Sequence, residues 1–317
     1  MSDIQDTGPA SKSSTGPQVV GLGYCAYDIL AITTGAPEFD ALHQPPHLTD
    51  LVIDGGGQVG TALSCLARLG ATTGYVGLLG DDPEGRWLRD AFVQSGVDLS
   101  RLQISADVGT NICLLLVEEH TGRRAILCHR RVHPKDLVLS QTDRPYIQQA
   151  RVLHLDGQFM PAALQAAHWM KQAGGIVCFD GNHNRPGLDE LLPLVDWLVV
   201  SEGFPALVSG CDDMEKAAHS LLALGPRLLV VTQAERGCQV WTREEKFSDP
   251  GFSVPVVDTT GAGDAFHGGW IYAMLQGWDV ARAAAFANAV AALNCQTLGG
   301  RRGLPTLAQV QALLLSR

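Results

Sequence analysis

The chain has 317 residues, of which 46% are hydrophobic, and 33 acidic side chains outnumber 23 basic ones, giving a formal net charge of −10. This length and composition suffice for one large α/β domain with a sizeable buried core. The negative charge argues against nucleic acid and anionic membranes as partners, because both attract clustered basic residues. A small-molecule partner is the better fit.

The N-terminal segment 1–17 is rich in Ser, Gly, Thr and Pro and lacks the basic start and apolar core of a signal peptide. We predict a disordered tail there and one folded domain over 18–317. The eight cysteines form no CxxC pair, so we interpret them as reduced structural thiols. The most apolar helical segment, 281–293, is too short to cross a bilayer. These features predict a cytoplasmic protein.

Apolar runs typical of buried strands occur at 19–23, 73–79, 152–155, 176–179, 197–200 and 228–232. Helical patterns lie between and after them, at 60–69, 84–95, 161–173, 214–224, 265–276, 280–293 and 307–315. Strands alternating with helices predict a three-layer α/β/α fold with a mostly parallel central sheet. Two stretches, 29–54 and 108–131, break the alternation with strand-like runs, which predicts hairpins at the edge of the core.

The segment most informative about chemistry is 254–268, VPVVDTTGAGDAFHG. It reads as a strand end, a glycine-rich turn and a helix that begins near Gly263. Gly261 and Gly263 allow a tight turn that aims backbone N–H groups at one point, and the helix N-terminus adds partial positive charge. These residues, with Ala262 between them, predict an anion hole for a phosphoryl group in transfer.

Asp264 falls in the first turn of that helix, beside the predicted anion hole. A carboxylate there can accept the proton of an attacking hydroxyl as a general base. Aspartate is also common in first turns simply because it stabilises the helix N-terminus. Taken alone, a glycine-rich turn followed by Asp is compatible with both roles.

The whole string resembles the signature D-T-x-G-A-G-D-x-F of the ribokinase-like (PfkB) carbohydrate kinases, matched from Asp258 to Phe266. The resemblance covers 19–315 and implies ATP-dependent phosphorylation of a small sugar with Mg²⁺, Asp264 being the catalytic base. It also implies that Asp258 and Thr260 help bind a monovalent cation, K⁺. A polar strand end without a bound ion is the alternative interpretation of those two residues.

Substrate-binding residues follow from the same resemblance. Segment 54–70, DGGGQVGTALSCLARLG, is similar to the family's first signature, in which Gly56 and Gly57 allow close backbone approach to the sugar. Asp28 occupies the position that grips sugar hydroxyls. Asn111 lies at the second hairpin, in a small β-sheet lid that the family forms from about 29–54 and 108–131. Such lids also pair subunits in the family, which implies a homodimer.

The nucleotide side is implied by VVTQAERG at 230–237, with Thr232 and Gly237 in matching places, and by Asn288, which matches a position beside the adenine. The segment 299–305, GGRRGLP, resembles a loop that packs against the nucleotide and cation sites. A solvated basic turn is the simpler interpretation of Arg301 and Arg302.

Two departures from the family pattern bear on the substrate and the metal. Gly60 stands where many of these sugar kinases have a sugar-binding asparagine. The family's NxxE motif reads SEGF at 201–204, so Glu202 is expected to take over the organisation of Mg²⁺ through water. In motif detail the chain is most similar to a bacterial branch with sulfofructose kinase and related ketose kinases, which points to a ketose or a derivative.

Other functions stay open or are disfavoured. A nucleoside or vitamin-alcohol kinase would use the same fold, and the changes at Gly60 and 201–204 would also suit a catalytically weak binding protein. The chain has no GxxxxGK[ST] motif and no complete dinucleotide-binding turn. His183 and His267 have no His or Cys at metal-binding spacing in the sequence, so we predict no structural zinc site.

Overall fold

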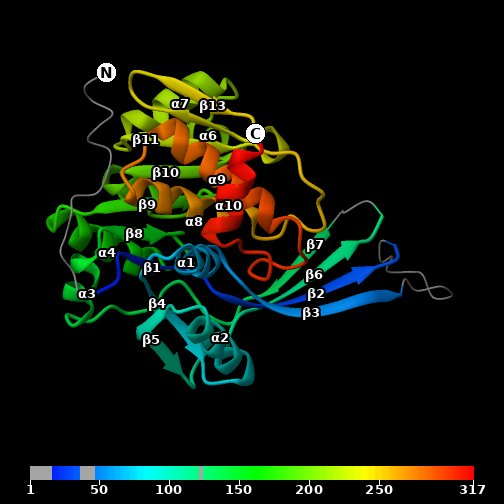
Figure 1. Cartoon of the computed structure of the whole chain (residues 1–317). Helices are drawn as coiled ribbons and strands as arrows, with labels where there is room; N and C mark the ends of the chain where they lie inside the picture. Colours follow the sequence, from blue (N-terminus) through cyan, green and yellow to red (C-terminus); the bar gives the residue numbers. More distant parts are fainter. Residues whose placement is uncertain (1–15, 36–46, 121–123) are drawn as a thin grey trace.

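The fold is built around a nine-stranded central sheet in the order β13-β12-β11-β10-β9-β8-β1-β4-β5 (Figure 1). It is seen in a computed structural model that describes residues 16–35, 47–120 and 124–317. The parallel part comprises β1 (Val19–Leu22), β4 (Thr73–Gly80), β5 (Asp98–Ser105), β8 (Val152–Leu155), β9 (Ile176–Gly181), β10 (Trp197–Ser201) and β11 (Leu228–Thr232). The strands β12 (Cys238–Trp241) and β13 (Lys246–Asp249) continue it antiparallel at one edge.

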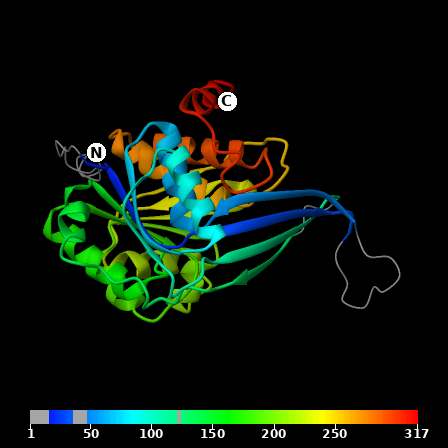
Figure 2. The same ribbon diagram turned by 90° about the horizontal axis from the view of Figure 1, so that it is seen from below.

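Helices cover both faces of this sheet (Figure 2). One face carries α1 (Gln58–Leu69), α2 (Pro83–Gln94), α8 (Ala262–Leu275), α9 (Val280–Asn294) and α10 (Leu307–Leu315). The other carries α3 (Asp143–Gln149), α4 (Met160–Gln172), α5 (Leu188–Leu191), α6 (Phe204–Ser209) and α7 (Met214–Ala223). Successive strand residues such as Val19 and Val20 enter opposite cores, as the period of two requires. The fold is therefore the predicted three-layer α/β/α arrangement.

A second sheet of four strands, in the order β3-β2-β6-β7, projects beyond the carboxyl ends of the central parallel strands (Figure 1). Its strands are β2 (Ala26–Thr33), β3 (Leu48–Gly56), β6 (Ile112–Glu118) and β7 (Arg124–His129). The two predicted hairpins are β2–β3 and β6–β7, and parallel pairing of β2 with β6 joins them. Residues 36–46 and 121–123 of the predicted hairpins lie outside the described residues.

The second sheet corrects one boundary. Strand β2 begins at Ala26, three residues before the predicted start at 29, so Asp28 lies within the second sheet rather than in a loop after β1. The predicted tail, 1–17, lies outside the described residues except for Gly16 and Pro17. Within the described ranges, no helix is long and apolar enough to span a membrane.

The strands that the sequence did not indicate are β5, β12 and β13, and the short helices α3, α5 and α6 were also missed. Strand β5 is at a sheet edge and mixes exposed and half-buried residues along its length. Its sequence, DLSRLQIS, therefore lacks the continuous apolar run that marked the central strands.

Candidate active site

The glycine-rich turn and the start of α8 form the centre of the site. Gly261 is the N-cap residue of α8 and has φ 72°, in the left-handed region. A Cβ at this position would lie 2.7 Å from Gly300 Cα, so only glycine fits. The Ala262 N–H donates to the Thr259 carbonyl at 3.3 Å, whereas Gly263 and Asp264 follow in the first turn, where N–H groups have no carbonyl one turn earlier. This helix start suits an anion.

Asp264 is partly buried in this first turn and makes no capping hydrogen bond to the helix. Burial and, to a smaller extent, the nearby Asp180 raise the pKa of its carboxyl to about 7, while Arg301 opposes the shift. A carboxyl that titrates near neutrality is matched to work as a general base at physiological pH. The geometry thus favours a chemical role for Asp264 over a purely structural one.

Asp28 faces the same region from the second sheet. It is 5% exposed, and burial raises the pKa of its carboxyl to about 8; Arg301 opposes this shift, while Asp54 and Asp264 add to it. A Cβ on Gly56 would lie 2.0 Å from an Asp28 carboxylate oxygen. Gly57 starts α1 with φ 88°, and a Cβ there would meet the Tyr24 carbonyl at 2.6 Å. Gly56 therefore leaves room for the Asp28 carboxylate, and Gly57 leaves room for the Tyr24 carbonyl.

Arg301 is placed in the site, which corrects the interpretation of this residue as a solvated basic turn. Its Nη2 donates to the Gly56 carbonyl at 2.7 Å, and its guanidinium stacks on Phe92 at 4.5 Å from the ring centroid. A Cβ at Gly60 would lie 2.3 Å from the same Nη2, so the missing side chain at Gly60 leaves the space that the guanidinium occupies. Gly60 and Arg301 are 241 positions apart in the chain, so no local sequence pattern indicates this contact.

The loop before α8 is tied to the segment that carries Arg301. Asp258 is 4% exposed and accepts from the Thr260 N–H at 2.9 Å, from the Thr260 hydroxyl at 2.8 Å and from the Gly299 N–H at 3.0 Å. These bonds fix the two loops on either side of the turn at Gly261. The carboxylate and hydroxyl oxygens form a hard donor set of the kind that an alkali cation accepts.

The predicted nucleotide residues lie together around β11, β12 and the end of β13. Thr232 ends β11 and donates to the Val200 carbonyl at 3.2 Å, and Gly237 has φ 78° with no room for a Cβ beside the Asp249 carbonyl. Asn288 is 7% exposed and donates to the Asp249 carboxylate at 2.7 Å. Its amide therefore braces β13 against α9.

Two predicted ligand residues are already engaged with protein groups. Glu202 accepts from Gln233 Nε2 at 2.8 Å and pairs with Arg236, and these bonds, led by that to Arg236, lower the pKa of its carboxyl. Asn111 is buried, and its side-chain oxygen accepts from the Arg131 N–H at 2.8 Å and the Val132 N–H at 3.1 Å. In this arrangement Asn111 fixes the chain after β7.

Sequence reasoning missed two buried carboxylates at the ends of neighbouring strands, Asp156 after β8 and Asp180 in β9. Burial raises the pKa of each to about 7. Arg185, half-buried on the loop after β9, is their nearby counter-charge. A signal was present, because LHLDG and VCFDG both end an apolar strand in Asp, and the carboxyl ends of parallel strands are where α/β sheets bind ligands.

The spacing of residues in the sequence does not indicate which His and Cys side chains lie close to His267. It lies on α8 within 4.8 Å, ligand atom to ligand atom, of His154 and Cys178, although 113 and 89 positions separate them in the chain. A buried trio of His and Cys thus exists that linear spacing could not reveal.

Comparison with known proteins agrees with this geometry. The model of the pfkB family carbohydrate kinases matches residues 17–307. The chain is 33% identical over 283 residues to aminoimidazole riboside kinase of Salmonella typhimurium, covering 82% of this chain and 88% of that protein. It is 33% identical over 251 residues to a fructokinase of Klebsiella pneumoniae, covering 70% and 80% respectively. The structure of Arabidopsis thaliana ribokinase complexed with ribose and ATP has the same fold, with a TM-score of 0.82, 23% identity, and coverage of 95% and 99%.

The family match and these relatives identify a sugar or nucleoside kinase, and the two-sheet architecture is the ribokinase fold. The chain belongs to the pfkB family of carbohydrate kinases.

The titration of Asp264 gives a prediction for the pH dependence of turnover. If Asp264 acts as a general base, it must be deprotonated, and with its pKa raised to about 7, kcat/KM should fall about tenfold per pH unit below pH 7 and level off above it. Initial rates from about pH 5 to about pH 9, with Mg²⁺ in excess so that ATP stays complexed, measure this. A profile that stays flat down to about pH 5 would show that Asp264 keeps an ordinary carboxyl pKa and would contradict the assignment.

Proposed function

We propose that this kinase transfers the γ-phosphate of ATP to a hydroxyl of a small sugar, a ketose or ketose derivative, with Asp264 as the general base. The observation that carries the proposal is the Asp264 carboxyl, with its pKa raised to about 7, in the first turn of a helix that begins at a left-handed glycine. At this helix end the accepting hydroxyl would lie beside a base, and the phosphoryl group would face oriented N–H donors.

The reaction needs in-line geometry. The sugar hydroxyl would lie beside Asp264, and Asp28 would hold neighbouring hydroxyls from the second sheet. The γ-phosphate would lie against the N–H groups of Gly263 and Asp264, and the rest of ATP would lie along Thr232, Gly237 and Asn288. Asp264 takes the hydroxyl proton as the oxygen attacks phosphorus, and ADP leaves on the opposite side.

Two cations are part of the proposal. Mg²⁺ bound with ATP would supply positive charge that offsets the charge of the phosphates. Because Glu202 is paired with Arg236 and Gln233, we assign the ion mainly to ATP and water, with Glu202 reaching it through water at most. K⁺ would be held by oxygens of Asp258 and Thr260. Because these residues come just before the Gly261 turn, binding of the ion would stabilise that turn.

The test is ADP release with Mg-ATP across ketoses, aldoses, sugar phosphates, sugar acids and nucleosides, with and without K⁺. Turnover on ketoses supports the proposal. Turnover only on nucleosides would favour the runner-up, a nucleoside kinase, for which the similarity to aminoimidazole riboside kinase is the specific support. ATP-induced thermal stabilisation without turnover on any acceptor would favour a binding protein and contradict the proposal.

The pairing of Gly60 with Arg301 predicts a coupled effect on sugar binding. Gly60→Asn alone should lower the Tm and raise KM for the sugar, because the new side chain collides with the guanidinium. Adding Arg301→Ala should recover part of the loss, with a coupling of about 0.5–3 kcal/mol in a double-mutant cycle. Gly203→Asn, at a glycine with nothing within 4 Å of its Cβ position, is the control. Additive effects would show that the two positions do not compete for one space.

We also propose that the second sheet is a lid over the sugar and pairs two copies of the chain. One residue from each strand forms an apolar row in register: Ile53, Ile29, Leu114 and Leu127. Three members of the row are exposed, from 38% to 54%. A row of this kind, left open to water on one sheet face, suits a like surface of a second copy.

The pairing can be tested by Leu127→Lys. This change should convert a dimer into a monomer in light scattering coupled to size exclusion, since it places a charge in the row. Leu224→Lys, at an exposed leucine after α7, should leave the dimer intact. A monomeric wild type would contradict the pairing without affecting the kinase assignment.

A further inference from the structure

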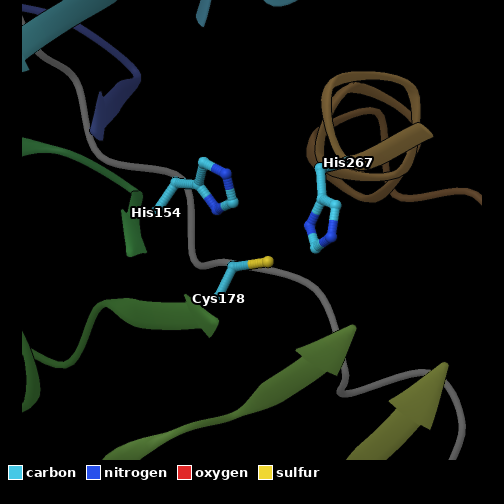
Figure 3. Close-up of side chains that lie close together, drawn as sticks. All are labelled: His154, Cys178 and His267. Carbon is cyan, nitrogen blue, oxygen red and sulfur yellow. The ribbon is translucent and has the colours of Figure 1, made fainter. Parts of the chain in front are cut away.

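The trio His154, Cys178 and His267 lies between the central sheet and α8 (Figure 3). His154 of β8 and Cys178 of β9 are register partners on neighbouring strands, so both side chains leave the sheet on the same face. His267 reaches them from α8, one helical turn after Asp264. The rings of His154 and His267 are 5.3 Å apart between centroids.

All three side chains are withdrawn from water, with exposures of 0% for His154 and Cys178 and 4% for His267. Within the described part of the chain, neither ring nitrogen of His154 makes a well-formed hydrogen bond, although the Cys178 backbone lies close enough to the ring to affect its pKa, and Nδ1 of His267 has no partner. Buried polar atoms are nearly always satisfied in native proteins, by protein groups, water or an ion. One ligand atom from each of the three side chains lies within 4.8 Å of the others, so a single ion could partner one nitrogen of each ring.

Burial also keeps both imidazoles neutral. It lowers the pKa of His154 well below its usual value, with help from His267, against a small opposing effect of the Cys178 carbonyl, and it lowers the pKa of His267 to about 3. A neutral imidazole has a free lone pair, which is the form that binds a metal.

We propose that His154, Cys178 and His267 bind a buried zinc ion as three protein ligands, with water in the fourth tetrahedral position. Two imidazole nitrogens and one thiolate form a donor set that Zn²⁺ accepts and that Mg²⁺ does not favour. The ligand atoms lie within 4.8 Å of one another. Tetrahedral Zn²⁺ at its usual bond lengths requires separations of roughly 3.3–3.8 Å, so side-chain movements of about 1 Å complete the site.

Asp180 supplies the outer shell. Its carboxylate lies 3.4 Å from Nε2 of His267, which leaves the unpartnered Nδ1 of that ring for the metal. A carboxylate behind a metal-bound histidine is the usual arrangement in zinc proteins, because it fixes the ring and its tautomer. The thiolate of Cys178 and the carboxylate of Asp180 together balance the two positive charges of the ion, so the buried group is neutral overall.

The position of this site gives it a function distinct from phosphoryl transfer. A metal there would tie β8 and β9 to α8, whose N-terminus carries Gly261 and Asp264. Occupancy would therefore stabilise the fold and hold the helix that presents the base, without contact to either substrate.

The metal content of purified protein tests the proposal. Protein isolated without a metal-affinity step or chelator should contain about one zinc per chain by mass spectrometry of the elements. The Cys178→Ala and His267→Gln variants should lose it. Cys65→Ala should retain it, because Cys65 is equally buried and its sulfur contacts the Ala265 carbonyl of the same helix, but it lies outside the trio.

A spectroscopic measurement on the wild type avoids dependence on variant folding. After removal of zinc, refolding in Co²⁺ without ATP or Mg²⁺ should give a sulfur-to-cobalt charge-transfer band and raise the Tm. The band should persist in Cys65→Ala and disappear in Cys178→Ala. Folded wild type with neither zinc nor a cobalt band, or zinc retained equally in all three variants, would overturn the proposal and leave a buried water as the partner of the rings.

Discussion

Asp264→Asn should lower kcat by about 10²–10⁴ while ATP and sugar still bind, because the amide cannot accept the proton of the attacking hydroxyl. The carboxyl has its pKa raised to about 7 by burial and by Asp180, so the charged form is costly to the fold at high pH. The variant should therefore be at least as thermally stable as the wild type at pH 8, with the difference shrinking as the pH falls toward 5. The assay is ADP release with the best acceptor.

The control for this substitution is Asp279→Asn. Asp279 is the N-cap residue of α9, where its side chain accepts from the Arg282 N–H, so Asn can replace it with little loss. Turnover should be unchanged in that variant. If Asp264→Asn behaved in the same way, with near wild-type turnover, Asp264 would be a helix-terminus residue and the assignment as the base would fail.

Gly261→Ala should cost at least 10²-fold in kcat and also lower the Tm. The residue has φ 72°, and the added Cβ would lie 2.7 Å from Gly300 Cα and 2.9 Å from the Gly300 carbonyl oxygen. Relief of that contact must move either the turn or the loop that carries Arg301. Loss of one aligned donor to a developing charge costs about 10²–10³ in rate. Steady-state kinetics and thermal unfolding together measure the two effects.

Gly277→Ala is the control for Gly261→Ala, because it introduces the same backbone strain without displacing a neighbouring loop. Gly277 has the same φ of 72° after the C-terminus of α8, with nothing within 4 Å of the Cβ position. It should lose about 1–2 kcal/mol of stability, the cost of a left-handed residue with a side chain, and no activity. If Gly261→Ala lost no more activity than Gly277→Ala, the turn at Gly261 would have no part in catalysis.

The shape of the glycine-rich turn could be predicted because it is local, whereas its role as an anion hole stays a prediction. A glycine-rich turn, a helix start and an Asp in the first turn are contiguous in the sequence, and the structure builds them as one feature at Gly261 and Asp264. The central strands were predictable for a similar reason, since a strand buried on both faces is a continuous apolar run. Edge strands such as β5 and β13 have mixed exposure and no such run.

The sequence by itself determined the family, the α/β class and the candidate base, since each depends on neighbours within a few residues or on the period of apolar side chains. Only the tertiary structure decided which distant residues share one space. It brought Arg301 into the gap left by Gly60, and it brought His267 to His154 and Cys178. It also engaged Asn111 and Asn288, both expected to face ligands, in hydrogen bonds to the protein. The physical reason is that packing and hydrogen bonding act at distances of a few ångströms in space. The sequence gives the order of residues but not these distances.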